Sequence, residues 1–295
     1  MRKRAYMYGR EAIWPQVARR YMETFQRARA ERRHFAPSDF AVKPLDKRPG
    51  EFPPLKLDHL QRMTDHTGMF QHAIFTVPNY VEGYTIDDNA RALLVSALLE
   101  ELGNPAAYEL SSRYLAFVWY AFNSETRRFR NFMDYQRNWL EENGSDDSHG
   151  RTLWALGTLL GRSSTAALQS TACRLFEQAL PLISDTTSPR AWAFALVGIH
   201  EYLRRFDGDR RASQVREQLA GRLLNLYEKN RAEDWRWYER SLTYCNAALP
   251  HALLMSGQRI PNYKMVEAGL ESLQWLADLQ RADTNGGHFV PIGSN

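Results

Sequence analysis

Apolar residues recur at helical spacing along most of the chain, and two kinds of helix alternate. One kind is apolar nearly all round, as in the stretch that opens at Pro189 and continues through Trp192 and Ile199. The other kind is amphipathic, as in residues 209–229, where the apolar positions share one side. Helices that are apolar all round are buried, whereas amphipathic helices keep one face in water. The pattern therefore predicts inner and outer helices arranged as consecutive α-hairpins.

The spacing and the breaker residues together predict an all-α chain with little strand. Helices are expected over residues 11–33, 57–63, 87–102, 105–122, from 148 onward, 164–182, from 188 onward, 209–229, from 241 onward and 262–281. Residues 64–85 are expected to be irregular. The hairpin repeat is roughly fifty residues long, which favours an (α/α) toroid over a short-repeat solenoid.

The N-terminal part differs from the rest of the chain. Residues 11–33 carry an apolar stripe that includes Trp14, Tyr21 and Phe25, yet almost no chain precedes it to cover that stripe. Five prolines between residues 36 and 57 indicate an extended linker. The sequence therefore predicts three parts: a helical segment over 1–35, a linker over 36–56 and a toroid domain over 57–295.

Charge is also uneven along the chain, although the net charge is only +4. Residues 1–50 hold 13 basic and 5 acidic residues, a net charge of +8, and the remainder holds 25 basic and 29 acidic residues, a net charge of −4. A basic arm can contact nucleic acid, anionic lipid or an acidic partner. No zinc-finger, helix-turn-helix or RNA-recognition pattern accompanies it, so we expect no nucleic-acid partner.

The cysteines and the apolar stretches indicate the compartment of the protein. The two cysteines, Cys173 and Cys245, form no disulfide framework, which is typical of a reducing cytoplasm. The basic first residues lead into no hydrophobic run, and no apolar stretch is long enough to span a bilayer. We therefore expect a cytoplasmic protein with no membrane span.

Polar residues gather where the inner helices begin. The first such mouth is Tyr84–Leu94, with Asp87, Asp88, Asn89 and Arg91 at the head of an apolar helix. Similar residues recur at 144–151, in Asp147, His149 and Arg151, and again at 237–250. For one such motif, a helix cap with a surface salt bridge is the simpler interpretation. Its recurrence in successive hairpins favours a shared site.

These stretches resemble the six-hairpin, glycosidase-like toroid that is found fused behind bacterial nucleotide-sugar glycosyltransferases. The resemblance is carried by residues 64–73, 84–94, 144–151, 237–250 and 287–295, and it covers most of 57–295. A shorter match, from Tyr8 to Phe25, resembles the last helix of such a glycosyltransferase. The resemblance implies an incomplete (α/α)6-type toroid that is truncated at both ends, with a glycosyltransferase domain or chain as partner.

A toroid of this kind would hold sugar in its central cleft, and glycoside chemistry uses two carboxyl groups. The catalytic candidates are Asp88, Asp147 and Glu239. The substrate-binding candidates are Tyr84, Asp87, Asn89, Arg91, His149, Arg151, Trp237 and Tyr238. The alternative remains open that Asp87 and Asp147 are helix caps, that the arginines tie adjacent hairpins together, and that Trp237 and Tyr238 belong to the core.

Four positions depart from the pattern that the resemblance leads us to expect. His66, Gln136 and Cys245 stand where an acid is expected, and Ala248 stands where an arginine is expected. The stretch 237–250, which is the mouth of the fourth hairpin, has thus lost a carboxylate and its arginine together, which weakens any catalytic interpretation.

The leading hypothesis is a glycosyltransferase-associated, carbohydrate-active domain that handles an oligosaccharide or polysaccharide, with glycoside hydrolysis by paired carboxylates. The alternatives are a non-catalytic glycan-binding or scaffolding module, or an inactive truncated fragment. The chain has no phosphate-binding glycine loop, no Rossmann fingerprint and no recognised zinc spacing. We therefore expect neither a cofactor nor a metal.

Overall fold

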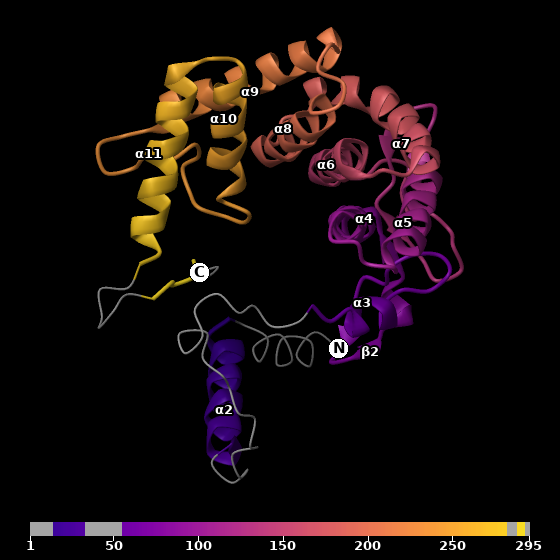
Figure 1. Cartoon of the computed structure of the whole chain (residues 1–295). Coiled ribbons are helices and arrows are strands. Elements are labelled where there is room, and N and C mark those ends of the chain that lie inside the picture. Colours follow the sequence, from indigo (N-terminus) through magenta and orange to yellow (C-terminus); the bar gives the residue numbers. More distant parts are fainter. Residues whose placement is uncertain (1–13, 33–54, 282–287, 293–295) are drawn as a thin grey trace, which may run out of the picture. The chain divides into compact units, whose positions relative to one another are not determined.

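The computed structural model describes residues 14–32, 55–281 and 288–292, and the chain divides into two compact units at Leu55 and Lys56 (Figure 1). In the first unit, helix α2 (Trp14–Arg32) matches the predicted N-terminal helix. Its apolar stripe is exposed, and the rings of Tyr21 and Phe25 lie 6.2 Å apart. The predicted linker lies almost wholly outside the described residues, so the three-part division stays a prediction.

In the described residues of the second unit, eight long helices pair as four α-hairpins. The pairs are α4 (Ile86–Glu101) with α5 (Ala107–Ala121), α6 (Asp146–Arg162) with α7 (Ala166–Ala179), α8 (Pro189–Leu203) with α9 (Arg210–Asn230), and α10 (Ala248–Arg259) with α11 (Tyr263–Leu279). Helix α4 packs on α6, α6 on α8, and α8 on α10. Figure 1 shows these first members along the inner side of an arc, as the alternation of apolar and amphipathic helices predicts.

Glycines allow α6 and α8 to pack closely against each other. A Cβ atom on Gly157 would enter the backbone of Gly198, and one on Gly150 would enter the backbone of Ala191. The two pairs keep the same offset along the chain, so α6 and α8 run parallel. Arg151 at the head of α6 also meets Asp87 at the head of α4, and Arg190 at the head of α8 meets Tyr244 before α10, so the four helix entries lie at the same end of the inner row.

The caps of the inner helices are hydroxyls that precede the acidic residues. The Oγ1 atom of Thr85 accepts a hydrogen bond from the backbone N–H of Asp88, and Ser145 accepts one from Ser148 in the same way, both at 3.1 Å. The alternative interpretation of Asp87 and Asp147 as caps is therefore wrong. Their carboxylates lie in the first helical turn and are free to interact with other side chains.

Short strands and 3-10 turns shape the loops that enter the inner helices. The described residues contain antiparallel pairs β1 (Ala73–Ile74) with β2 (Val77–Pro78), β3 (Tyr84–Thr85) with β6 (Phe132–Met133), and β4 (Phe122–Asn123) with β5 (Arg128–Phe129). The remaining short elements are α3 (Asp58–Arg62), η2 (Tyr80–Glu82) and η3 (Leu180–Asp185).

The β3–β6 pair brings a second loop to the head of α4. The carbonyl oxygen of Asn131 accepts from the N–H of Ile86 at 2.9 Å, and its Oδ1 atom accepts from the N–H of Asp87 at 3.2 Å. Asn131 therefore satisfies two backbone donors that would otherwise be unpaired at a helix start.

The fourth inner helix begins later than its pattern predicts. Helix α10 starts at Ala248, and the residues from Ser241 up to it form a loop. The reason is local, because Cys245 has a φ of 45°, in the left-handed region that no α-helix can contain. The fourth mouth is therefore a loop, not the head of a helix.

Candidate functional site

A cavity of about 350 Å³ opens at the heads of α4 and α6. It is lined by Gln71, His72, Thr85, Asp87, Asp88, Arg91, Asn131, Phe132, Ser145, Asp147, Ser148 and Arg151. Five of the predicted site residues are among these, and all five carry charge. The first two mouths therefore line one cavity.

Asp87 lies between two arginines from neighbouring hairpins. Arg91 of its own helix contacts one carboxylate oxygen, and Nε of Arg151 on α6 lies 3.0 Å from the other. Arg91 also pairs with Asp88 at 3.1 Å. Burial raises the pKa of Asp87, and the charges of Arg151 and Arg91 offset that rise only in part. Asp87 therefore holds its proton more readily than an exposed aspartate.

The two predicted catalytic aspartates of this cavity both accept hydrogen bonds from hydroxyls. The hydroxyl of Thr85 donates to Asp88 at 2.6 Å. Asp147 accepts from Ser188, which caps α8, and from the hydroxyl of Tyr244 in the loop before α10. Burial, with the neighbouring Asp147 carboxylate, raises the pKa of Tyr244 to about 12.

Glu239, the third predicted catalytic residue, does not line this cavity. Both of its carboxylate oxygens accept from Nη1 of Arg190, at 2.8 and 2.9 Å. Arg190 is almost fully buried, its Nε donates to the carbonyl of Tyr244, and its guanidinium lies 4.7 Å from that ring. Glu239 therefore connects to the cavity only through Arg190 and Tyr244, and it anchors a loop.

Tyr84 and Asn89, predicted to contact a ligand, are buried. Tyr84 stacks on Phe70 and donates its hydroxyl hydrogen bond to Asp65 at 2.7 Å, and burial together with that bond raises its pKa. Oδ1 of Asn89 accepts from the N–H of Met69 at 2.8 Å. These two side chains hold the 64–85 loop against α4 and offer no surface to a sugar.

His149, Trp237 and Tyr238 are likewise in the core, each with at most 1% of its surface exposed. One ring nitrogen of His149, Nε2, lies 3.1 Å from the carbonyl of Ala179, so the neutral ring carries its proton there. Burial lowers the pKa of His149 to about 4. The hydroxyl of Tyr238 lies 3.0 Å from that of Ser272 on α11. The interpretation of Trp237 and Tyr238 as core residues is the one that fits.

Several residues of the site carry no motif of their own. Gln71, His72 and Asn131 reach the cavity from loops, and pairing between loops distant in sequence places them there. Tyr244 reaches Asp147 from the fourth hairpin. The one signal that could have indicated Ser188 and Arg190 is their position at the head of an inner helix.

Two residues before and at the start of α10, Cys245 and Ala248, differ from the acid and the arginine that the resemblance leads us to expect. Cys245, which stands where an acid is expected, places its Sγ 3.9 Å from Nη2 of Arg151. Ala248 is the first residue of α10 and carries no polar group. Arg151 therefore meets a thiol where a carboxylate would have formed an ion pair.

None of the helices that the structure describes is long and apolar enough to cross a membrane. No group of three or more His, Cys, Asp or Glu side chains among the described residues is arranged to hold a metal ion. The polar groups that line the cavity are carboxylates, guanidiniums, hydroxyls, amides and the imidazole of His72.

The arc of parallel inner helices with mouths at one end defines an (α/α)6-type toroid architecture, and the comparison with solved structures confirms that predicted fold. Cellobiose 2-epimerase from Bacillus thermoamylovorans matches with a TM-score of 0.60 at 11% identity, over 75% of this chain and 69% of that one. A sugar epimerase from a ruminal bacterium matches with a TM-score of 0.58 at 12% identity, over 77% and 72%.

A D-mannose isomerase matches in the same way, with a TM-score of 0.56 at 14% identity, over 79% of this chain and 71% of that one. No family model matches the sequence, and no curated protein matches it. At these identities the likeness establishes the fold alone.

Proposed function

We propose that the toroid unit of this chain binds carbohydrate in the cavity at the heads of α4 and α6. The observation that carries the proposal is the convergence of Asp87, Asp88, Arg91, Asp147 and Arg151 on one cavity of about 350 Å³. Carboxylates and guanidiniums supply the acceptors and paired donors that sugar hydroxyls require. The three similar structures are named for enzymes that act on sugars, which supports the same ligand class.

The hydrogen bonds within the cavity favour a non-catalytic binding module. Asp88 accepts from Thr85, Asp147 accepts from Ser188 and Tyr244, and Asp87 is held between two arginines. A glycosidase needs one protonated and one ionised carboxyl group on either side of the scissile bond. Carboxylates that already have protein partners suit the recognition of hydroxyls better than proton transfer to a glycosidic oxygen.

Glycoside hydrolysis is the second candidate, because one observation favours it. The raised pKa of Asp87 is the property that a general acid needs if it is to keep its proton near neutral pH. Asp88 or Asp147, which line the same cavity, would then act as the base. Glu239 is left out of this assignment because its carboxylate pairs with Arg190.

Association with a glycosyltransferase is a further part of the proposal. Helix α2 exposes Trp14, Tyr21, Met22 and Phe25, and an apolar stripe of this size is typical of a docking helix. A transferase encoded beside this chain would be the partner. The double variant Tyr21→Glu, Phe25→Glu is expected to abolish co-elution of the two purified chains, and unchanged co-elution would contradict the partnership.

The sugar site is tested by calorimetric titration of the full chain with mannose, cellobiose and cello-oligosaccharides. We expect binding by at least one of them, and a loss of affinity of about tenfold in Asp88→Asn and in Asp147→Asn. Asp58→Asn, on the exposed face of α3, is the matched control and should bind as the unmodified chain does. Equal binding by all three variants, or no binding at millimolar sugar, would overturn the proposal.

The same samples distinguish a module from an enzyme. Reducing-end release that disappears in Asp87→Asn and Asp147→Asn would select hydrolysis. A change in the anomeric or C2 proton signals of free mannose or cellobiose in NMR spectra would select sugar isomerisation. Binding with neither change is the result expected for the module.

A further inference from the structure

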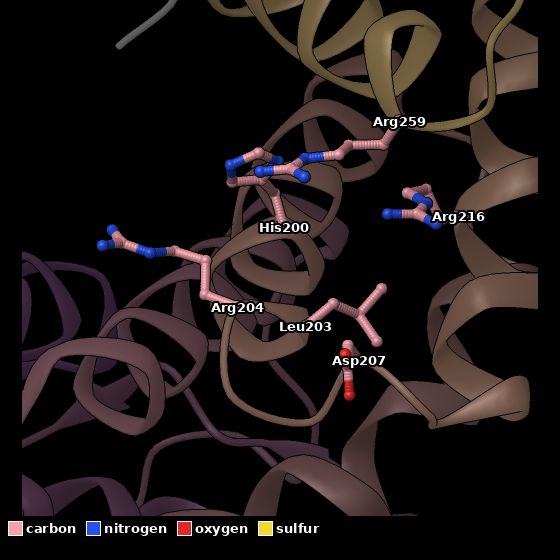
Figure 2. Close-up of a pocket in the computed structure, with 6 residues that line it drawn as sticks. All are labelled: His200, Leu203, Arg204, Asp207, Arg216 and Arg259. Atoms are coloured by element: carbon pink, nitrogen blue, oxygen red, sulfur yellow. The ribbon is translucent and has the colours of Figure 1, made fainter.

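A second cavity, of about 380 Å³, lies at the opposite end of the inner row, beside the C-terminal ends of α8 and α10 (Figure 2). Its walls are His200, Leu203, Arg204, Asp207, Arg216 and Arg259. Three of the six are arginines, and one is an aspartate. Because α6 and α8 run parallel from the mouths, this cavity is separate from the candidate sugar site.

Two of the arginines form no ion pair among the described residues, although the charge of Glu217 acts on Arg216 and Arg259 is exposed. Arg204 pairs with Glu201 at 3.0 Å, and Figure 2 shows its side chain pointing away from the others. Among the described residues, Arg216 and Arg259 form no ion pair or hydrogen bond, although Asp207 lines the same cavity. Nε of Arg216 is buried without any acceptor. A buried guanidinium N–H without an acceptor is costly, so this arrangement calls for an anion.

Helix dipoles explain only part of the cluster. Arg204 follows the last residue of α8 and Arg259 is the last residue of α10, and the C-terminal end of a helix stabilises a cation. Arg216 has no such support, because it lies in the second turn of α9. Figure 2 shows Arg216 on one side of the cavity, while the guanidinium of Arg259 extends towards His200. Arg216 is therefore the residue whose position a purely structural role does not explain.

The cations also act on one another. Burial lowers the pKa of Arg216, the charge of the neighbouring Glu217 offsets part of that fall, and the charge of Arg259 adds to it. Burial is the largest influence on His200 as well, and despite the nearby Glu201 its pKa is lowered, with contributions from Arg259, Arg204 and Arg216. A neutral His200 can still donate or accept one hydrogen bond. An anion bound among these groups would relieve their mutual repulsion.

We propose that this cavity binds a phosphate group, either as free phosphate or as the phosphate ester of a small molecule, with Arg216 and Arg259 as its principal ligands. Guanidinium groups match phosphate oxygens with paired N–H donors. The volume is within the range of small-molecule sites, so a phosphate ester has room for its organic part. This site goes beyond the proposed sugar site and does not depend on it.

The test is calorimetric titration of the full chain with inorganic phosphate, with glucose 6-phosphate and with glucose, at constant ionic strength. We expect both phosphates to bind and glucose to leave this cavity empty. Arg216→Gln and Arg259→Gln should each weaken phosphate binding by tenfold or more. Arg211→Gln removes the same charge from an exposed position of α9 and should change the affinity by less than twofold.

The comparison of the two probes identifies the source of the phosphate group. An ester that binds at least tenfold more tightly than inorganic phosphate would identify a phosphorylated small molecule, and equal affinities would identify free phosphate. No binding by either probe at 10 mM, on the order of the weakest affinity worth measuring, would overturn the proposal. Equal weakening by Arg211→Gln and Arg216→Gln would also overturn it, because it would indicate general charge attraction.

A second measurement guards against loss of folding. Arg216→Gln removes an unpartnered, partly buried charge, so we expect its thermal midpoint without ligand to equal or exceed that of the unmodified chain. Phosphate should raise the midpoint of the unmodified chain and leave that of Arg216→Gln unchanged. A lower midpoint without ligand in Arg216→Gln would show that the guanidinium has a protein partner and would contradict the proposed site.

Discussion

At the residue scale, His149 was predicted to contact a ligand, but the structure places it in the core. The ring is buried and neutral, with Nε2 bonded to a backbone carbonyl and Nδ1 without a partner. Its pKa of about 4 lies below the ordinary value of 6.5. Below pH 6.5 the unfolded chain binds a proton that the folded chain does not. The free energy of unfolding therefore decreases as the pH is lowered.

We expect His149→Gln to flatten the acid limb of the stability curve. The unmodified chain should lose about 3 kcal/mol from this group as the pH falls from above 6.5 to below 4, because the loss is complete only below the folded-state pKa. Urea unfolding at several pH values measures the effect. His66→Gln, at an exposed histidine, is the control and should keep the slope of the unmodified chain. An unchanged slope in His149→Gln would contradict the assignment.

At the element scale, the packing of α6 on α8 depends on the absence of side chains. Gly157→Ala would drive a methyl group into the backbone of Gly198, so we expect a loss of roughly 3 kcal/mol of unfolding free energy. Helix propensity alone predicts a gain for the same change. Thermal or urea unfolding decides between them.

Gly221→Ala, in α9, is the matched control because a methyl group there meets nothing within 4 Å. It should stabilise the chain by about 0.5–1 kcal/mol through lower entropy of the unfolded state. Similar effects in Gly157→Ala and Gly221→Ala would show that the two helices are not in backbone contact.

The loop before α10 depends on one buried ion pair. Glu239→Ala would leave Arg190 almost fully buried without its carboxylate, so we expect a loss of roughly 3 kcal/mol and faster proteolysis between α9 and α10. Limited trypsin digestion with mass spectrometry locates the cuts. Glu142→Ala breaks the exposed pair with Arg130 and should cost less than about 1 kcal/mol. Equal losses in both variants would contradict the anchoring role.

The sequence was sufficient for the elements and insufficient for the site. Helical periodicity places the heads of α4, α6 and α8 within a few residues, because apolar spacing is a local property. The periodicity places the start of α10 too early, because the left-handed backbone of Cys245 prevents the helix from beginning before that residue. Tyr84 and Trp237 are aromatic residues next to polar ones, a pattern that also fits an exposed ring that stacks on a sugar. Their burial depends on contacts with residues distant in sequence, which the local pattern does not contain.

At the scale of the whole molecule, the division at Leu55 and Lys56 predicts that the toroid unit folds alone. A chain that begins at Lys56 behind a starting methionine should unfold at the same midpoint as the full chain, within about 2 °C, because few contacts cross a domain boundary. Calorimetry with circular dichroism measures this. A much lower midpoint would show that residues 1–55 support the toroid.

Asp147 has a further consequence for the molecule. Its carboxylate sits at the head of α6, yet it also receives the hydroxyl of Ser188 on the third hairpin and that of Tyr244 before the fourth. Three successive hairpins thus share one acceptor. A ligand hydroxyl that bonds to Asp147 must compete with Tyr244, so occupancy of the cavity would release the loop that enters α10. Faster amide hydrogen exchange in that loop would then report binding that takes place two hairpins away.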